Sequence, residues 1–347
     1  MSRQSRNFGR IWVLVAVMVV LVGTTITAPR ANAMSSRLSK VIGGTVDVNT
    51  NLAYQNAAAA GTGMILNSGG EVLTNNHVIR GATTIKVQDI DNGHTYTATV
   101  VGYDVAADVA VLRLNGASGL KVVPIGNSTS VKVGAKVTAI GNANGAGGTP
   151  SSADCSVTAL KQAIVAADEL GGTSERLTGL IETNCTLQPG QSGGPLVDSV
   201  GKVIGMNTAA SSNYAFMNGG SKAFAIPINA ATSIAKQIVA GHFSGNVHRG
   251  ATAFLGVQVT SSGYFKDGGY FAGALVVGIV PASPAQKQGL GYGDVITVLN
   301  GRSITSAAVI TNVLLAASPG MKVGLSWVDK FGATHRASIT LASGPPQ

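Results

Sequence analysis

The sequence is poor in cysteine, in charge and in long apolar stretches. Its 347 residues include only two cysteines, too few for a disulfide scaffold or a cysteine-based zinc site. Only 11% of residues are charged, and Lys and Arg are scattered singly without interleaved aromatics, which excludes a nucleic-acid-binding surface. Beyond the N-terminal segment, no apolar run approaches the roughly 20 residues of a membrane-spanning helix.

Glycine, in contrast, is abundant. The 46 glycines are nearly twice the usual share. From about residue 58 to residue 225, short apolar or alternating runs are separated by Gly, Asn and Asp. Many short strands at this spacing predict a mostly β protein built as a sandwich or as barrels.

The N-terminus has the pattern of an export signal. Three arginines in the first ten residues precede an apolar run at residues 11–23, and a small-x-small sequence ends at Ala33. This pattern predicts a secretory signal peptide, residues 1–33, and a secreted or cell-envelope protein. An uncleaved membrane anchor stays open, because residues 24–28 could extend the run. Removing four of the 24 basic residues and no acidic one lowers the net charge from +9 to +5.

Export gives the two cysteines a meaning. In an oxidising compartment, a disulfide between Cys155 and Cys185 is the default expectation. Closing a loop of that length would stabilise the chain by roughly 3 to 4 kcal/mol in the loop-entropy model.

Two units follow the signal. The first, residues 34–241, holds the strand-rich region and ends in a helix near residues 229–241. A polar, glycine-rich stretch at 242–250 is predicted to be a linker. The second unit, residues 251–343, has four strand patterns and one helical segment at 306–317.

Residues 188–196 read QPGQSGGPL, which places Ser192 among glycines. A serine hydroxyl is a poor nucleophile near neutral pH, so a base must take its proton. Four of the five histidines lie in polar segments, whereas His77 lies in what reads as an apolar strand, EVLTNNHVI. A lone histidine there is more often structural.

Asp108 favours the catalytic interpretation. It falls inside the apolar strand pattern AADVAVLRL, where a carboxylate is costly unless it is paired. An imidazole N–H is a fitting partner, because the carboxylate then fixes the tautomer of the base. The rival, Asp104, lies in an ordinary turn.

The glycines supply a further part of the site. A tetrahedral intermediate needs backbone N–H groups directed at its oxyanion, and glycine tolerates the backbone angles that this requires. We expect Gly190 and Ser192 to be the donors. Gly193 and Gly194 are expected to leave room for substrate.

The order of TNNHVI, DVAVLRL and QPGQSGGPL resembles the trypsin-like serine proteases of the HtrA (Deg) type, in particular exported mycobacterial members. The resemblance implies a chymotrypsin-like domain of two perpendicular β-barrels, with His77, Asp108 and Ser192 as the catalytic triad between them. It also implies ATP-independent hydrolysis of unfolded or misfolded proteins. No metal or nucleotide motif is present, so no cofactor is expected.

The second unit resembles a PDZ domain. Its segment AFLGV is similar to the carboxylate-binding loop of that family, which places Phe254, Leu255, Gly256 and Val257 at the loop. Such a domain binds a peptide C-terminus as an added strand beside its sheet edge. The helical segment at 306–317 would wall the groove.

Gln191 decides against zymogen activation. The string KVIGG at 40–44 is similar to an activation site at which a new N-terminus pairs with an aspartate before the serine. Gln191 occupies that position and carries no charge, and a buried ammonium without an anion is strongly disfavoured. We therefore predict that KVIGG is an ordinary strand entry and that Gln191 hydrogen-bonds within its loop.

Resemblance to trypsin-like enzymes also places a specificity pocket. Thr186 aligns with the base of that pocket, which argues against preference for Arg or Lys. The expected wall residues are Met206, Asn207 and Phe224. A small or medium aliphatic residue before the scissile bond is predicted.

Two other classes of function stay open: a peptide-binding or chaperone module with an idle protease fold, and a secreted surface protein whose main role is to bind a partner. A homo-oligomer is also open, but residues 34–53 lack the aromatic segment through which many relatives form trimers. The expected partners are unfolded proteins and C-terminal peptides, not nucleic acid. Membrane association requires an uncleaved signal.

Overall fold

The computed structural model describes residues 31–347 except for 168–173, 209–221, 244–245, 251 and 267–268. Nearly all of the predicted signal peptide lies outside these residues. Its predicted cleavage point after Ala33 falls in helix α1 (Ala31–Gly43). Within the described ranges, no helix combines the length and the apolar character needed to cross a membrane.

We had predicted that the KVIGG string is a strand entry, and this prediction is wrong. Lys40 to Gly43 form the last turn of α1, and strand β1 begins only at Thr45. Leu38 and Val41, three residues apart, lie on one face of the helix and are both buried in the protein core. Burial of this face holds the segment as a helix.

The first barrel contains six strands in the order β5-β4-β1-β2-β3-β6, and pairing of β5 with β6 closes it. A one-turn segment η1 (Ala53–Gln55) and a short helix α2 (Asn76–Ile79) interrupt the strands. The strands are β1 (Thr45–Leu52), β2 (Ala57–Ile65), β3 (Glu71–Thr74), β4 (Thr84–Asp89), β5 (Thr95–Asp104) and β6 (Val109–Leu114).

The second barrel is closed in the order β10-β11-β12-β9-β8-β7. Two one-turn segments, η2 (Ser128–Ser130) and η3 (Ala143–Gly145), lie in its loops. Its strands are β7 (Lys136–Gly141), β8 (Ser151–Ala167), β9 (Ser174–Thr183), β10 (Pro195–Asp198), β11 (Val203–Thr208) and β12 (Ala223–Pro227).

A disulfide joins Cys155 to Cys185, with Cα atoms 5.0 Å apart, as predicted. It ties β8 to the segment that leads from β9 into the QPGQSGGPL loop. Helix α4 (Ile228–Val239) then returns across both barrels and buries the face made by Ile228, Ala231, Ala235 and Ile238. The two-barrel prediction is confirmed.

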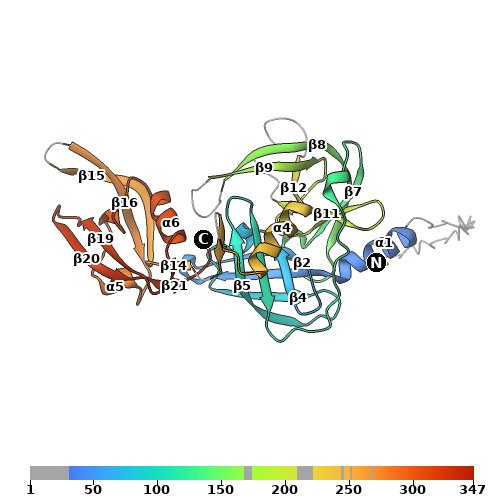
Figure 1. Cartoon of the computed structure of the whole chain (residues 1–347), viewed down its shortest axis with the longest axis horizontal. Coiled ribbons are helices and arrows are strands. Elements are labelled where there is room, and N and C mark those ends of the chain that lie inside the picture. The colour runs from blue at the N-terminus through green and yellow to red at the C-terminus, as the bar shows by residue number, and fades with distance from the viewer. Residues whose placement is uncertain (1–30, 168–173, 209–221, 244–245, 251, 267–268) are drawn as a thin grey trace, which may run out of the picture.

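The second unit lies at one end of the molecule (Figure 1). It has its own apolar core around a sheet in the order β15-β16-β17-β19-β20, with β18 beside β17 and a separate β14–β21 pair. Its elements are β14 (Thr252–Phe254), β15 (Val257–Lys266), β16 (Gly269–Ile279), α5 (Pro284–Lys287), β17 (Val295–Leu299), β18 (Arg302–Ser303), α6 (Ala307–Leu315), β19 (Lys322–Val328), β20 (Thr334–Thr340) and β21 (Ala342–Gly344).

The predicted linker is partly a strand. Residues Val247–Arg249 form β13, which extends the first barrel by pairing with β5, Val247 lying opposite Asp104. After β21 the chain returns to the same barrel: Gly81 N–H donates to Pro346 O at 2.8 Å. The second unit is therefore attached to the first barrel both before and after its own sheet.

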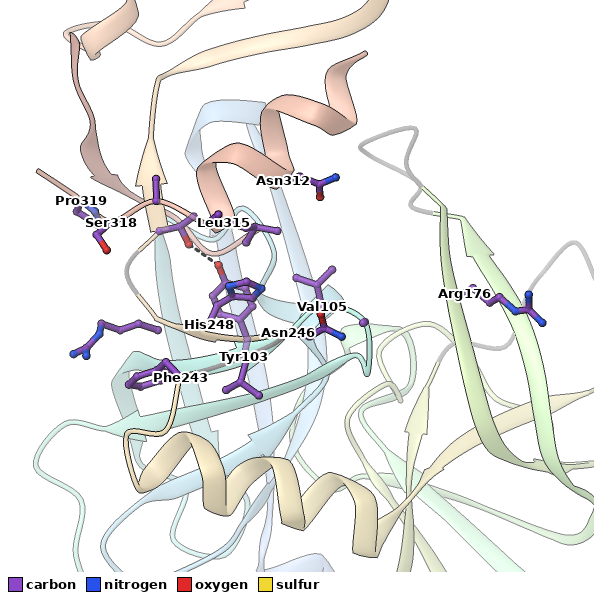
Figure 2. A pocket seen from close by; sticks show the side chains of 16 residues that line it. Tyr103, Val105, Arg176, Phe243, Asn246, His248, Asn312, Leu315, Ser318 and Pro319 are labelled. Carbon is purple, nitrogen blue, oxygen red and sulfur yellow. Dashed lines mark hydrogen bonds between the residues drawn. The ribbon is translucent and has the colours of Figure 1, made fainter. Parts of the chain in front are cut away.

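A cavity of about 1150 Å³ lies at this junction (Figure 2). Tyr103 and His248 line it from the first barrel, and Leu315 lines it from the second unit. Burial lowers the pKa of His248, while the Asp104 carboxylate and the hydrogen bond with the Leu315 backbone act in the opposite direction. None of the three predicted triad residues lines this cavity.

Candidate active site

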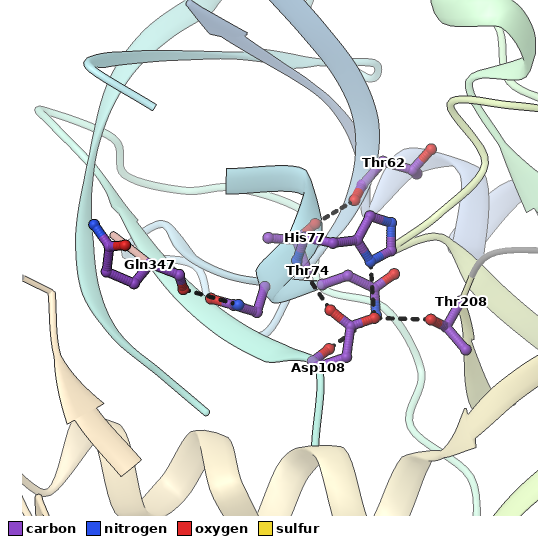
Figure 3. Close-up of polar contacts among 8 residues, drawn as sticks. Thr62, Thr74, His77, Asp108, Thr208 and Gln347 are labelled. Carbon is purple, nitrogen blue, oxygen red and sulfur yellow. Dashed lines mark hydrogen bonds and ion pairs between the residues drawn. The ribbon is translucent and has the colours of Figure 1, made fainter. Parts of the chain in front are cut away.

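Strand pairing brings His77 and Asp108 together. The end of β3 meets the start of β6 because the two strands are antiparallel, with Thr74 opposite Ala110. The chain turns into α2 after β3, and His77 is the second residue of that helix. Its Nδ1 lies 2.8 Å from Asp108 Oδ2, and its backbone N–H donates to Asp108 Oδ1 at 2.9 Å (Figure 3).

The sequence had predicted that both residues lie within strands, but neither does. His77 is on α2, and Asp108 directly precedes β6 with φ of 53°, in the left-handed region. Local polar bonds explain both departures. The Asn75 side chain donates to the Asp108 carbonyl at 2.9 Å, and the bond from His77 N–H to the Asp108 carboxylate holds the start of the helix against the turn.

Asp108 is held as a carboxylate although it is only 2% exposed. Burial alone would raise its pKa, but the charge of the His77 ring, two hydrogen bonds from His77 and one from Thr208 together hold the pKa of this carboxyl below its usual value. Because Asp108 accepts at Nδ1, the proton of neutral His77 sits on that nitrogen. Nε2 then carries the lone pair that a general base needs.

The sequence analysis did not find Thr208. It is the last residue of β11, so it comes from the second barrel, and its hydroxyl donates to Asp108 Oδ2 at 2.8 Å. A threonine at the end of an apolar strand carries no local signal of this contact. The hydrogen bond from the Thr208 hydroxyl thus crosses the barrel interface and ends on the Asp108 carboxylate.

The loop that carries Ser192 requires glycine at two positions for steric reasons. Gly190 and Gly193 have φ of 90° and 84°. A Cβ at Gly190 would come within 2.2 Å of Asn142 O, and one at Gly193 within 2.0 Å of Thr62 O. The loop therefore packs against backbone on both sides of the serine.

We had expected Gly193 and Gly194 to leave room for substrate. In the structure they serve this packing instead. A Cβ at Gly194 would meet Ile140 O at 2.2 Å. The Gly193 N–H donates to Asn207 O, and the Gly194 N–H donates to Gln191 O. The two glycines allow the loop to approach the strands β2 and β7.

The backbone N–H groups of Gly190 and Ser192 differ from those of Gly193 and Gly194. Among the hydrogen bonds of the described residues, neither amide is a donor. Pro189 O accepts from Asn144 N–H at 2.6 Å, and because a trans peptide directs its N–H opposite to its C=O, Gly190 N–H points away from Asn144. Gln191 O is likewise engaged, by Gly194, which turns Ser192 N–H the other way.

The second unit presents a similar loop between β14 and β15. Gly256 has φ of 84°, and a Cβ there would meet Ser283 Cβ at 2.1 Å. Leu255 O accepts from Ala285 N–H, and Gly256 O accepts from Val280 N–H, both at 2.9 Å. The N–H groups of Gly256 and Val257 consequently point away from the domain core, and β15 is an edge strand.

Comparison with known proteins agrees with both halves. Residues 61–206 match the trypsin-like peptidase domain family, and residues 253–337 match the PDZ domain family. Serine protease PepD of Mycobacterium tuberculosis is 33% identical over 319 residues, covering 87% of this chain and 64% of PepD. A probable periplasmic serine protease of the do/HhoA-like type from Haemophilus influenzae is 35% identical over 292 residues, covering 83% and 59%.

Among solved structures, the HtrA-type protease AlgW with a tripeptide is similar over 90% of this chain and 98% of that one, with 28% identity and a TM-score of 0.50. The chain has a trypsin-like peptidase domain and a PDZ domain, and it is similar to the HtrA-type serine proteases. It spans less than two thirds of the length of the curated relatives, 64% and 59% for the first two.

Gln191, directly before Ser192, carries no charge and is held by hydrogen bonds. Its side chain is 2% exposed. The side-chain oxygen accepts from Gln188 N–H at 2.7 Å, and the side-chain nitrogen donates to Ser151 Oγ at 3.0 Å. Gln191 thus closes its own loop, as expected, and anchors it to β8 without a buried charge.

The residues expected to form the specificity pocket differ in their exposure to solvent. Thr186 is exposed, whereas Met206 and Phe224 are buried in the core. Asn207 is also buried, and its side chain donates to the carbonyls of Ile140 and Pro195. The long loop after Thr208, residues 209–221, lies outside the described residues.

A smaller cavity of about 430 Å³ joins the protease domain to the PDZ groove. His77 and Arg80 line it on one side, and Val257 and Leu315 line it on the other. Tyr54 of η1 stacks on Phe254 with ring centres 5.3 Å apart, and Gln258 Nε2 donates to Tyr54 O at 2.8 Å. The start of edge strand β15 in the PDZ domain and His77 therefore line the same cavity.

The end of the described chain also reaches this side. Gln347 O accepts from the Asn76 side chain at 3.1 Å (Figure 3). Asn76 immediately precedes His77, so the segment after β21 contacts the helix that carries the base.

Asp47 is a second residue that the sequence analysis missed. It lies on β1, is fully buried, and accepts from Gly148 N–H at 3.0 Å through Oδ2. Its Oδ1 has no hydrogen-bond partner among the described residues. Burial raises the pKa of Asp47 to about 6, against the effect of the Gly148 bond.

Proposed function

We propose that this chain is a serine endopeptidase that uses Ser192 as nucleophile, His77 as general base and Asp108 as the group that orients the base. The observation that carries the proposal is the pair formed by buried Asp108 and partly exposed His77, with Thr208 of the second barrel donating to Asp108. It occurs together with a nucleophile loop whose Gly190 and Ser192 amides donate to no group of the described residues.

The reaction follows from these groups. His77 Nε2 takes the proton from Ser192 Oγ as that oxygen forms a bond to the scissile carbonyl carbon. The carbonyl oxygen becomes an oxyanion and accepts from Gly190 and Ser192 N–H. His77 then gives its proton to the leaving amine, and the acyl-enzyme is hydrolysed by a water that His77 activates in the same way.

The PDZ domain would supply the substrate end. Its edge strand β15 and the outward N–H groups of Gly256 and Val257 fit a peptide C-terminus that adds as a strand. The proposed substrates are unfolded or misfolded proteins, because their extended termini can enter such a groove. The proposed preference before the scissile bond is a small or medium aliphatic residue, with Thr186 at the pocket.

Export completes the proposal. Relatives in Haemophilus influenzae and Ectopseudomonas mendocina are named periplasmic serine proteases. Together with the signal pattern of residues 1–33 and the disulfide, these names support a protein that works outside the cytoplasm.

A fluorophosphonate probe tests the site. The chain from residue 34 to 347 should be labelled, and the labelling should disappear in Ser192→Ala and in His77→Ala. Retention of labelling in Ser192→Ala would place the reactive residue elsewhere.

The same variants separate hydrolysis from binding. A peptidase loses its cellular role in Ser192→Ala. A chaperone or binding protein keeps that role in Ser192→Ala and loses it when residues 251–347 are deleted. This second outcome would refute the proposed function.

A further inference from the structure

Thr62 bonds the loops around Ser192 through both its backbone N–H and its hydroxyl. It lies on β2, in the first barrel, and is fully buried. Its N–H donates to Ser192 O at 2.8 Å, and its hydroxyl donates to Gly190 O at 2.7 Å. The same hydroxyl accepts from Asn142 N–H at 2.9 Å, so its donor and an acceptor site are both used.

Thr62 is also tied to the strand that leads to His77. Its carbonyl accepts from the Thr74 hydroxyl at 2.7 Å (Figure 3). Thr74 is the last residue of β3, three positions before His77. One residue of β2 therefore contacts the strand before the base and the loop that carries the nucleophile.

The hydroxyl acts on the peptide that follows Gly190, next to the peptide that carries the Gly190 N–H. Gly190 is flanked by two peptide planes, and the carbonyl of each is held: Pro189 O by Asn144 N–H, and Gly190 O by Thr62 Oγ1. With φ of 90° at a glycine, this segment has access to conformations that other residues avoid. Fixing both carbonyls selects the one in which Gly190 N–H is directed away from its neighbours.

We propose that Thr62 is a positioning residue for the oxyanion hole: its hydroxyl holds the peptide that follows Gly190 and, together with the Asn144 bond to Pro189 O, fixes the backbone turn in which the Gly190 N–H faces the developing negative charge. This proposal rests on the proposed peptidase function. Thr62 does not contact substrate. It acts through Gly190, and through Asn142 on the neighbouring loop of the same barrel.

Two substitutions isolate the hydroxyl. Thr62→Val keeps the size, the β-branched shape and the backbone N–H that binds Ser192 O, and removes only the bonds to Gly190 O and Asn142 N–H. Thr62→Ser keeps the hydroxyl. Thr45→Val is the matched control, because Thr45 is also fully buried on an adjacent strand and its hydroxyl donates to a backbone carbonyl, Val41 O, away from the loop.

The measurement is kcat and KM for a peptide substrate, per active site titrated with the fluorophosphonate, together with inhibition by a peptide boronate that mimics the tetrahedral intermediate. Deleting one oxyanion donor costs about 10²- to 10³-fold in kcat. Misdirecting one should cost on the order of 10- to 100-fold on the same scale. We expect Thr62→Val to lose kcat by that factor with KM little changed, and to bind the boronate correspondingly more weakly.

Thr62→Ser should restore both values, and Thr45→Val should retain them. Equal kcat in Thr62→Val and the unmodified chain would overturn the role of Thr62 and leave the peptidase function standing. An unmodified chain that neither hydrolyses nor labels would overturn the function and this role with it.

Thr62→Ala gives a second test if Thr62→Val does not fold, since it leaves space for a water beside the loop. A folded Thr62→Ala with the same loss of kcat supports the role. Loss of fold in both variants while Thr45→Val folds would show that the hydroxyl serves the whole barrel interface, which would overturn a specific role at the oxyanion hole.

Discussion

The two barrels contribute to the site by different means. In the first barrel, paired strands β3 and β6 set His77 and Asp108 side by side, so the sheet register itself does the positioning. In the second barrel, Ser192 lies on an irregular loop whose shape depends on individual hydrogen bonds, two of them to Thr62 across the interface. His77 and Asp108 thus follow directly from paired strands, whereas the Ser192 loop is held by a few replaceable contacts.

The largest effect should come from the carboxylate of the first barrel. Asp108→Asn keeps the shape but presents an amide to His77, which favours the wrong tautomer, and a loss of about 10⁴-fold in kcat is expected. Steady-state kinetics on a peptide substrate measures it. Asp104→Asn is the control, because Asp104 accepts from Ala107 N–H rather than from a catalytic group. If Asp104→Asn lost kcat to that extent and Asp108→Asn did not, the assignment of Asp108 as the catalytic carboxylate would be wrong.

Breaking the second barrel's loop should cost less. In Gly190→Ala the new Cβ would clash with Asn142 O, so the peptide must turn, and a loss of about 10²- to 10³-fold in kcat is expected. Gly134→Ala is a matched control: Gly134 has a similar φ of 87°, with nothing within 4 Å of the added Cβ. It should lower stability slightly and leave kcat unchanged.

The disulfide tests how far the second barrel relies on covalent support. Replacing Cys155 and Cys185 together by alanine should lower the free energy of unfolding by roughly 3 to 4 kcal/mol, because the unfolded chain regains the entropy of an open loop. Urea unfolding measures the change. Unfolding midpoints that coincide with those of the oxidised parent would show that the bond contributes nothing.

Asp47 gives the smallest and most pH-dependent effect. Burial raises its pKa to about 6 in the folded chain, above the ordinary value of 3.8, so the folded state binds the proton more tightly and this residue's contribution to stability is lost as pH rises toward 6. Asp47→Asn should therefore be more stable than the parent at pH 7.5, by at most about 3 kcal/mol. The advantage should disappear near pH 4. Thermal unfolding at several pH values tests this, and a pH-independent difference would contradict it.

The sequence predicted those strands that a local pattern of apolar residues marks. Strands β4, β5 and β6 lie between residues 58 and 225, where short apolar or alternating runs predicted many strands, because alternation or a continuous apolar run marks a strand wherever it packs. β1 was missed, since TVDVNTNL contains polar residues that the structure buries, Asp47 and Thr50 among them.

The same limit applied to the site. His77, Asp108 and Ser192 could be named because each residue type is chemically unusual in its surroundings. Thr62 and Thr208 could not, because a threonine in a strand is ordinary and their importance comes from which distant loop the fold places against them. Contacts across a barrel interface are a property of the closed structure and leave no periodic signal in the chain.

The double attachment of the PDZ domain has a mechanical consequence. The chain leaves the first barrel through β13, hydrogen-bonded along β5, and returns to it at Gly81 through Pro346. A rigid body held at two points keeps one rotation, about the line that joins them, and loses the others. The stack of Tyr54 on Phe254 and the bond from Gln258 Nε2 to Tyr54 O oppose that rotation, so the PDZ domain can turn relative to the first barrel only if these two contacts break.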